Sequence, residues 1–427
     1  MVFKKAASDS GHNKERLKRT LGLPSLIFFG VGVILGAGIY ALVGKAAGFA
    51  GNMLWFSFLI ASLTAVLTAF SYAELVALFP IAGGEYVYTK KAIGNKTANF
   101  IGSMISLNGI VSGATIALAF AGYFAELVNI NQIISAIGIL LIILTINIIG
   151  IRESSIANII FTIIEIGGLC YVIYAAFPYI GSVDLIKLPE QGFNGLMIAA
   201  ALSFYSYIGF EDIVKLAEET KNPEKKISMA LFIAPVIVFL IYGLVSISAV
   251  SAIPFEQLAA SKSPLADILN KRFGYVGAII ISVVALFSTS NTILSNMIGS
   301  SRVILSMSEE SKLFKVFSYV SPRFKTPVAA VLLVGILMAV FSLIGNLMTV
   351  ALIANLFIYI TFFSVNLAVI ILRKKEPHLH RPFKIPGAIK GIPVICIMAI
   401  IMILIMFVYN IGGLFISFNQ TALSQLF

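Results

Sequence analysis

The stretch Gly30–Gly44 reads GVGVILGAGIYALVG and lies in the middle of the first long apolar segment of the sequence. Five of its fifteen residues are glycine, and each glycine disfavours a helix interior by about 1 kcal/mol relative to alanine. Within a membrane, backbone groups freed from a helix are tolerated where they line a cavity. The stretch therefore has two interpretations: a helix broken at a binding site, or close helix packing through small residues. A second interrupted segment, at the matching place of a second half, would favour the break.

The composition excludes a soluble globular protein. Hydrophobic residues make up 59% of the chain and charged residues 11%, and the mean hydropathy is +1.00. The first twenty residues are polar and basic and lack the apolar core of a secretory signal, so we expect the first span to be retained. The two cysteines lie in apolar runs and the three histidines in polar segments. We accordingly predict neither a metal site nor a cofactor.

The arrangement of the charges predicts the topology. Counted with a cytoplasmic N-terminus, 25 of the 30 lysines and arginines fall on the cytoplasmic side and 5 on the outer side, a positive-inside bias. The net charge of +11 therefore reflects topology, and no nucleic-acid partner is expected. We expect a multi-pass protein of the plasma membrane with a cytoplasmic N-terminus. Apolar spans of about 20 residues are predicted near 24–48, 53–79, 97–128, 131–149, 154–178, 193–217, 227–251, 273–305, 327–345, 347–372 and 389–411.

The sixth of these spans supplies a second interruption. It contains FYSYIGFEDIVK, in which the helical pattern breaks at Tyr207–Phe210 and charged side chains follow at membrane depth. Glu211 and Lys215 are four residues apart, so a local ion pair is the plain account of part of this charge. Gly36 and Gly209 are 173 residues apart, and the second and third spans repeat in the second half at nearly the same offset. Two halves of five spans, each opened by a broken helix, indicate an inverted repeat.

Polar residues inside the other spans are further candidates. Glu165 lies near the middle of the fifth span, where a carboxylate costs about 2.5–3.5 kcal/mol on insertion scales, so it is a functional candidate by default. The alternative is a structural hydrogen bond from a protonated acid. Asn108, Ser112 and Thr115 share one face of the third span, for which helix packing is the commoner explanation. The four polar residues Ser288–Asn291 cluster in the eighth span and favour a hydrated face.

Four segments of the chain resemble the amino acid–polyamine–organocation superfamily, and most of all its bacterial and archaeal amino acid permeases, related to the cationic amino acid transporters. The resemblance runs from about Leu21 to Pro393. It implies an all-α integral membrane protein with a LeuT-type 5+5 inverted repeat, in which helices 1 and 6 are broken. We count 11 transmembrane helices and leave a twelfth open. The four segments are GVGVILGAGIYALVG, GGEYVYTKKAIG, FYSYIGFEDIVKLAEETKNPEKKI and ALFSTSNTILSNMIGSSRVIL.

The domain organisation follows from this resemblance. Residues 1–20 form a cytoplasmic tail, 21–180 the first five-helix repeat and 193–372 the second, inverted repeat. Residues 373–388 form a basic cytoplasmic loop, and 389–427 contain a peripheral eleventh helix and the C-terminus.

The resemblance also implies the substrate site. The first break would bind the substrate carboxylate through backbone N–H groups, and the second would offer carbonyl groups to the amino group. The following aromatic residue would close over the substrate, and an apolar cavity would favour a neutral side chain. By motif, the first break is Gly36, Ala37 and Gly38; the second is Tyr205, Ser206, Ile208 and Gly209; the closing aromatic is Phe210; and Ile34, Leu35, Phe204 and Phe210 line the cavity.

A coupling site is implied at Glu165, where several proton-coupled members of the superfamily carry a lysine. This carboxylate would carry a proton, bind a cation or contact the substrate, and Ser288 and Thr289 are expected beside it. The leading interpretation is a secondary active transporter that moves amino acids by alternating access, with proton-coupled uptake of neutral or broad-specificity L-amino acids. The alternative is a transporter or exchanger of cationic amino acids or polyamines in which Glu165 contacts the substrate.

Other classes of function fit less well. A channel does not need paired broken helices in an inverted repeat, and a membrane-embedded enzyme would need a nucleophile–base pair or a metal cluster. The expected partners are an amino acid, a coupling ion (a proton in preference to sodium) and the lipid bilayer, and the expected assembly is a monomer or homodimer.

Overall fold

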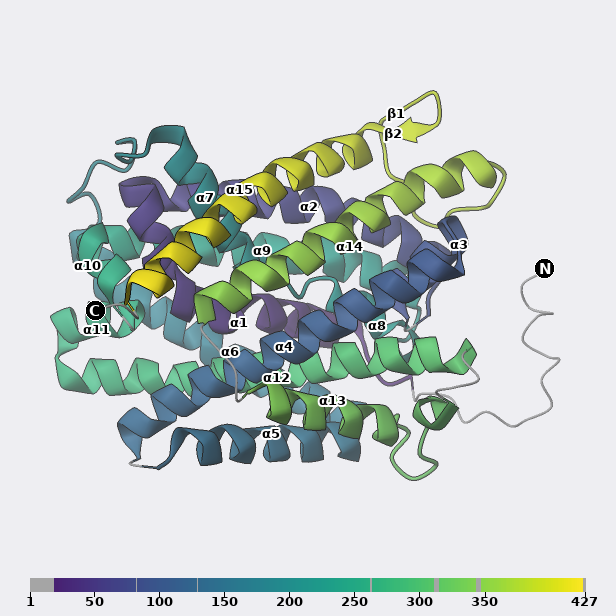
Figure 1. Ribbon diagram of the computed structural model, residues 1–427, viewed down its shortest axis with the longest axis horizontal. Coiled ribbons are helices and arrows are strands. Elements are labelled where there is room, and N and C mark those ends of the chain that lie inside the picture. Colours follow the sequence, from purple (N-terminus) through teal and green to yellow (C-terminus); the bar gives the residue numbers. More distant parts are fainter. Residues whose placement is uncertain are drawn as a thin grey trace.

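Long helices that run roughly along one axis make up this computed structural model, which describes residues 19–424 except 82, 129, 262, 311–314 and 343–346 (Figure 1). The predicted all-α membrane class is confirmed: ten helical segments of the described chain are long and apolar enough to cross a bilayer. The helices are α1 (Leu23–Ala50), α2 (Leu54–Leu78), α3 (Gly84–Ala92), α4 (Asn95–Leu127), α5 (Gln132–Ile149), α6 (Ile151–Ala176), α7 (Gly192–Phe204), α8 (Asp212–Lys215), α9 (Pro223–Ala252), α10 (Phe255–Ala260), α11 (Pro264–Phe273), α12 (Tyr275–Glu310), α13 (Val328–Phe341), α14 (Leu347–Lys375) and α15 (Val394–Ser424).

The ends of the bundle carry short elements. The helices α10 and α11 lie at one end, and α3 lies at the other with the small hairpin of β1 (Ala388–Ile389) and β2 (Ile392–Pro393) (Figure 1). The predicted span 327–345 corresponds to α13, which is shorter than the ten candidate spans. Most of the predicted tail, residues 1–18, lies outside the described residues.

Both predicted breaks are present. The helix α1 leaves helical geometry at Gly36 (φ −20°, ψ −162°). In the sixth span, α7 is followed by the 3-10 turn η4 (Tyr205–Tyr207), the extended residue Ile208 and then Gly209, before α8 begins. Gly209 has φ +118°, a conformation that side chains with a Cβ rarely adopt. The inverted symmetry between the two halves stays a prediction.

The helix α1 packs at the centre of the bundle, against α6, α7, α9 and α12. Its glycines also serve close packing, because a Cβ at Gly30 would lie 2.9 Å from the Cβ of Ala234, and one at Gly32 would collide with Thr162 and Asn291. In a bilayer, such small residues let helices approach closely. Both interpretations of the opening stretch therefore apply, at different glycines.

The helix α15 lies at the periphery. It packs on α14, α7 and α2 and exposes Ile401, Leu404 and Val408, which suits contact with lipid.

Candidate functional site

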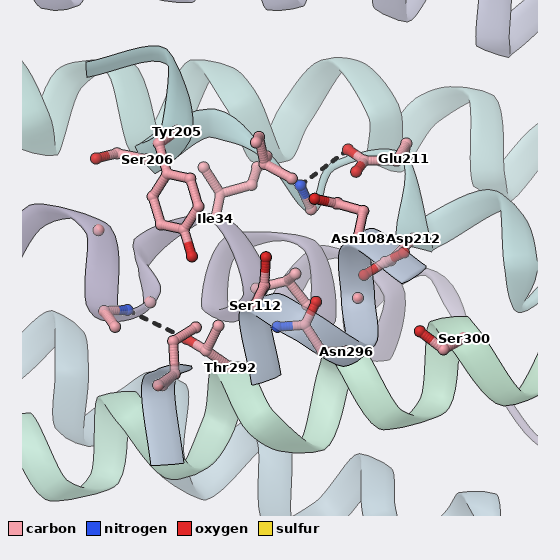
Figure 2. A pocket seen from close by; sticks show the side chains of 18 of the residues that line it. Ile34, Asn108, Ser112, Tyr205, Ser206, Glu211, Asp212, Thr292, Asn296 and Ser300 are labelled. Carbon is pink, nitrogen blue, oxygen red and sulfur yellow. Dashed lines mark hydrogen bonds between the residues drawn. The ribbon is translucent and has the colours of Figure 1, made fainter. Parts of the chain in front are cut away.

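A narrow cavity of about 30 Å³ lies where the two breaks face α4 and α12 (Figure 2). This volume accommodates about two water molecules, so the helices must separate to admit a larger ligand. Its lining combines backbone of both breaks with polar side chains of the facing helices. The lining residues are Val33, Ile34, Gly36, Ala37, Gly38, Ile105, Asn108, Gly109, Ser112, Ile116, Tyr205, Ser206, Ile208, Gly209, Glu211, Asp212, Lys215, Thr292, Asn296 and Ser300.

The first break presents a backbone donor to this cavity. The N–H of Ala37 donates to the hydroxyl of Thr292 on α12 at 3.1 Å (Figure 2). That hydroxyl in turn donates to the carbonyl of Ser288 at 3.1 Å. Because the N–H is released by the irregular backbone at Gly36, its partner comes from another helix. A freed N–H group at a helix terminus is the kind of donor that binds carboxylates and phosphates.

The second break is tied to the first through Tyr242 of α9. Its buried hydroxyl donates to the carbonyl of Ile34 at 2.5 Å and lies 3.1 Å from the carbonyl of Ser206. One side chain therefore holds a freed carbonyl of each broken helix. Nothing in the sequence singles out Tyr242, because it is a single tyrosine in an otherwise ordinary apolar span.

Three charged side chains line the cavity beyond the second break. The expected pair of Glu211 with Lys215 is wrong: Lys215 donates to Asp212 at 2.5 Å, and Glu211 accepts the N–H of Gly209 at 2.8 Å. The short turn before α8 brings the carboxylate of Glu211 back over its own backbone, so it stabilises the break. Within the described chain, no cluster of three or more metal-binding side chains is found.

The predicted site residues fall into two groups. Eight of them line the cavity, whereas Leu35, Phe204 and Phe210 lie outside its lining. Phe204 stacks on Tyr359, with ring centroids 4.8 Å apart, and Phe210 packs edge-on against Tyr72 at 5.7 Å. Of the four side chains expected to make an apolar cavity, only Ile34 is in the lining of the described cavity, since successive helical residues face different directions. The eight lining residues are Ile34, Gly36, Ala37, Gly38, Tyr205, Ser206, Ile208 and Gly209.

The wall opposite the breaks is polar. On α4, Asn108 and Ser112 line the cavity, which corrects the packing interpretation for these two; Thr115 bonds the carbonyl of Val111 in its own helix. On α12, Thr292, Asn296 and Ser300 line the cavity at a spacing of four residues. Sequence reasoning passed over these three, although polar residues at i, i+4 and i+8 in an apolar span mark one face of a helix.

Glu165 lies outside the cavity lining, in a buried polar network between α6, α12 and α1. The amide of Asn291 donates to one carboxylate oxygen of Glu165 at 3.3 Å and to the hydroxyl of Thr162 at 3.2 Å. The other carboxylate oxygen has no hydrogen-bond partner among the described residues. Of the two residues expected beside Glu165, Ser288 lies close to its carboxylate, although its hydroxyl makes no hydrogen bond of standard geometry among the described residues. Thr289 instead bonds the carbonyl of Ala285 in its own helix.

The chain is similar to known proteins along most of its length. The family model described as "Amino acid permease" matches residues 21–422. The chain is 31% identical to the branched-chain amino acid permease BcaP of Bacillus subtilis, covering 95% of this chain and 90% of that protein. It is 29% identical to the methylthioribose transporter of the same bacterium (93% and 89%) and 30% identical to mouse cationic amino acid transporter 4 (84% and 60%).

Proposed function

Because the chain belongs to the amino acid permease family and is an amino acid transporter, we propose that it is a secondary active transporter driven by protons. It takes up neutral L-amino acids across the plasma membrane by alternating access, with its N-terminus in the cytoplasm. Membership of a permease family points to transport rather than to enzymatic chemistry, and the relatives are named as transporters of small molecules.

One observation carries the proposal: both helix breaks line the same cavity. The substrate carboxylate binds backbone N–H groups of Gly36–Gly38, where the Ala37 N–H now bonds Thr292. The ammonium group binds the carbonyls of Tyr205, Ser206 and Ile208, one of which now lies by Tyr242. An N–H cluster favours an anion and freed carbonyls favour a cation, so the pair suits a zwitterion.

The proposed coupling residue is Glu165, with Ser288 and Thr289 on the neighbouring helix. Its carboxylate is fully buried and makes no ion pair within the described chain. A buried carboxylate without a cationic partner is disfavoured in its charged form, so a change in its surroundings that admits water would favour release of its proton. Its network joins α6 and α12 to α1 through the carbonyl of Phe28. Movement of α1 during transport would therefore change the hydrogen bonds around Glu165.

Glu165→Gln tests this coupling, because glutamine keeps the shape but does not titrate. In proteoliposomes we expect the variant to exchange internal for external alanine and to lose accumulation driven by a proton gradient. The matched control is Glu190→Gln, at an exposed loop position, which should accumulate alanine like the unmodified protein. Proton-driven accumulation by Glu165→Gln would contradict the coupling role, and accumulation on a sodium gradient alone would contradict proton coupling.

A further inference from the structure

The wall of the cavity opposite the breaks comes from one face each of α4 and α12 (Figure 2). The two helices touch closely here: a Cβ at Gly109 would lie 3.6 Å from the amide oxygen of Asn296 and would collide with the hydroxyl of Ser300. The absence of a side chain at Gly109 therefore brings the polar residues of both helices to one place. Asn108 and Ser112, on either side of Gly109 in the sequence, complete this wall.

Two carboxamides of this wall lack partners. Asn108 is 4% exposed, and its amide oxygen makes no hydrogen bond within the described chain. Asn296 is half-buried, lines the same cavity and makes no side-chain hydrogen bond within the described chain. Buried polar groups are almost always hydrogen-bonded, and an exception in a native structure calls for an explanation. A polar ligand in the cavity supplies the missing partners.

The charged groups of the cavity already have partners. The ammonium of Lys215 is held by Asp212, and the carboxylate of Glu211 accepts the N–H of Gly209. A ligand carboxylate would have to compete with these acids, whereas a carboxamide meets the side chains of Asn108 and Asn296 without disturbing either contact.

We propose that the transporter selects amino acids with an uncharged carboxamide side chain, asparagine and glutamine, over those with branched aliphatic side chains. This inference rests on the proposed function: with carboxylate and ammonium at the two breaks, the side chain faces α4 and α12. A carboxamide donates to the Asn108 oxygen and exchanges hydrogen bonds with the Asn296 amide. Leucine would leave both amides unpaired, and sites built around hydrogen bonds discriminate strongly against analogues that lack them.

Competition against radiolabelled alanine uptake in proteoliposomes tests the inference with the full chain. We expect glutamine and asparagine to inhibit at concentrations at least about tenfold lower than leucine or isoleucine, the effect of one net hydrogen bond. Leucine inhibiting as well as glutamine would overturn the inference, and so would arginine inhibiting best. Alanine reports separately on the proposed function, because its short side chain does not reach the wall. Without uptake of any amino acid, the proposed function itself fails.

Variants assign the selectivity to the wall. Asn108→Leu and Asn296→Leu keep the branched shape of the side chain and remove its hydrogen-bonding groups, so each should shift the ratio of glutamine to leucine inhibition about tenfold or more towards leucine. The control Asn99→Leu lies on the same helix at an exposed position outside the lining and should keep the ratio. Because the ratio is taken within one variant, reduced folding does not change it. An unchanged ratio in both wall variants would contradict the assignment.

Discussion

At the scale of single residues, the glycines of the first broken helix have different roles. Gly36 is where the backbone leaves helical geometry, whereas Gly38 lies against the second break. A Cβ at Gly38 would lie 2.8 Å from the Cα of Ser206 and 2.7 Å from its hydroxyl. Since a Cα atom moves only with its backbone, any side chain at Gly38 must push the two breaks apart.

Gly38→Ala should therefore abolish or strongly reduce alanine uptake while leaving the protein inserted in the membrane. The methyl group of alanine is already enough to produce this clash. The matched control is Gly243→Ala in α9, where an added Cβ meets no atom within 4 Å. This variant should keep normal uptake, and the substitution should raise the stability of the helix by a few tenths to about 1 kcal/mol. Normal uptake by correctly inserted Gly38→Ala would show that the two breaks need not touch.

At the scale of elements, α3 is held to the bundle by a buried acid. Glu85 is fully buried, and one of its carboxylate oxygens accepts the hydroxyl of Tyr72 on α2 at 3.0 Å, whereas the other has no partner in the described chain. Burial raises the pKa of Glu85, and the ammonium of Lys215 opposes this rise. The folded state thus disfavours the ionised form of this side chain.

The expected consequence is a stability that depends on pH. A carboxyl whose pKa is higher in the folded than in the unfolded state stabilises the fold at low pH, and this contribution is lost as pH rises through the raised pKa. Glutamine does not titrate, so Glu85→Gln should remove this loss. In detergent, the thermal unfolding temperature of the unmodified protein should fall more steeply with pH above the ordinary glutamate range than that of Glu85→Gln. The exposed Glu153→Gln is the control. Identical pH profiles for Glu85→Gln and the unmodified protein would contradict this account.

A second contact between elements joins three segments near the start of α1. Arg302 of α12 donates to Glu219 of the 3-10 turn η5 (Ala217–Glu219) at 2.8 Å, and both side chains are fully buried. The carbonyl of Glu219 in turn accepts the N–H groups of Thr20 and Leu21 at 3.0 Å. The ion pair therefore links both broken helices to α12.

Breaking this ion pair should destabilise the protein strongly. Arg302→Met leaves an unpaired buried carboxylate, for which a loss of about 3–5 kcal/mol is typical. The double variant Arg302→Met/Glu219→Gln should lose less than the sum of the two single variants, because neither buried charge then remains. Unfolding in detergent measures all three. Additive losses would mean that the two side chains do not stabilise the fold as a pair.

At the scale of the whole molecule, the basic residues gather at the end that carries α3 and the hairpin. Glu74 at the end of α2 accepts Arg373 and Arg381, at 2.9 and 3.1 Å, and the N–H of Ile385 at 2.9 Å. The loop 373–388 is thus fixed to the bundle by one buried carboxylate. Its position suits the cytoplasmic side, where positively charged loops are retained.

Thiol labelling tests this orientation. In a background with Cys170→Ser, which removes the exposed native cysteine, Lys187→Cys should react with a membrane-impermeant reagent in intact cells. Lys384→Cys, in the loop 373–388, should react only after lysis. Both positions are exposed, so access to the reagent depends on the side of the membrane. Labelling of Lys384→Cys in intact cells would reverse the proposed topology.

The sequence by itself determined the class of the protein, ten of its eleven predicted spans and its two breaks. These depend on local chemistry: apolar length sets a span, and glycine permits a break, as at Gly36 and Gly209. The motif resemblance also predicted which backbone groups line the cavity. This was possible because the position of a backbone group along a broken helix also fixes its position in the cavity.

Only the tertiary structure decided which side chains face those breaks. Leu35, Phe204 and Phe210 were expected in the cavity and lie outside its lining, whereas Asn296 and Ser300 line it. The reason is physical: the direction of a side chain depends on how its helix is rotated against its neighbours. Tyr242, which bonds a carbonyl of α1 from α9, likewise has no local signature, because its role exists only once the distant helices have packed.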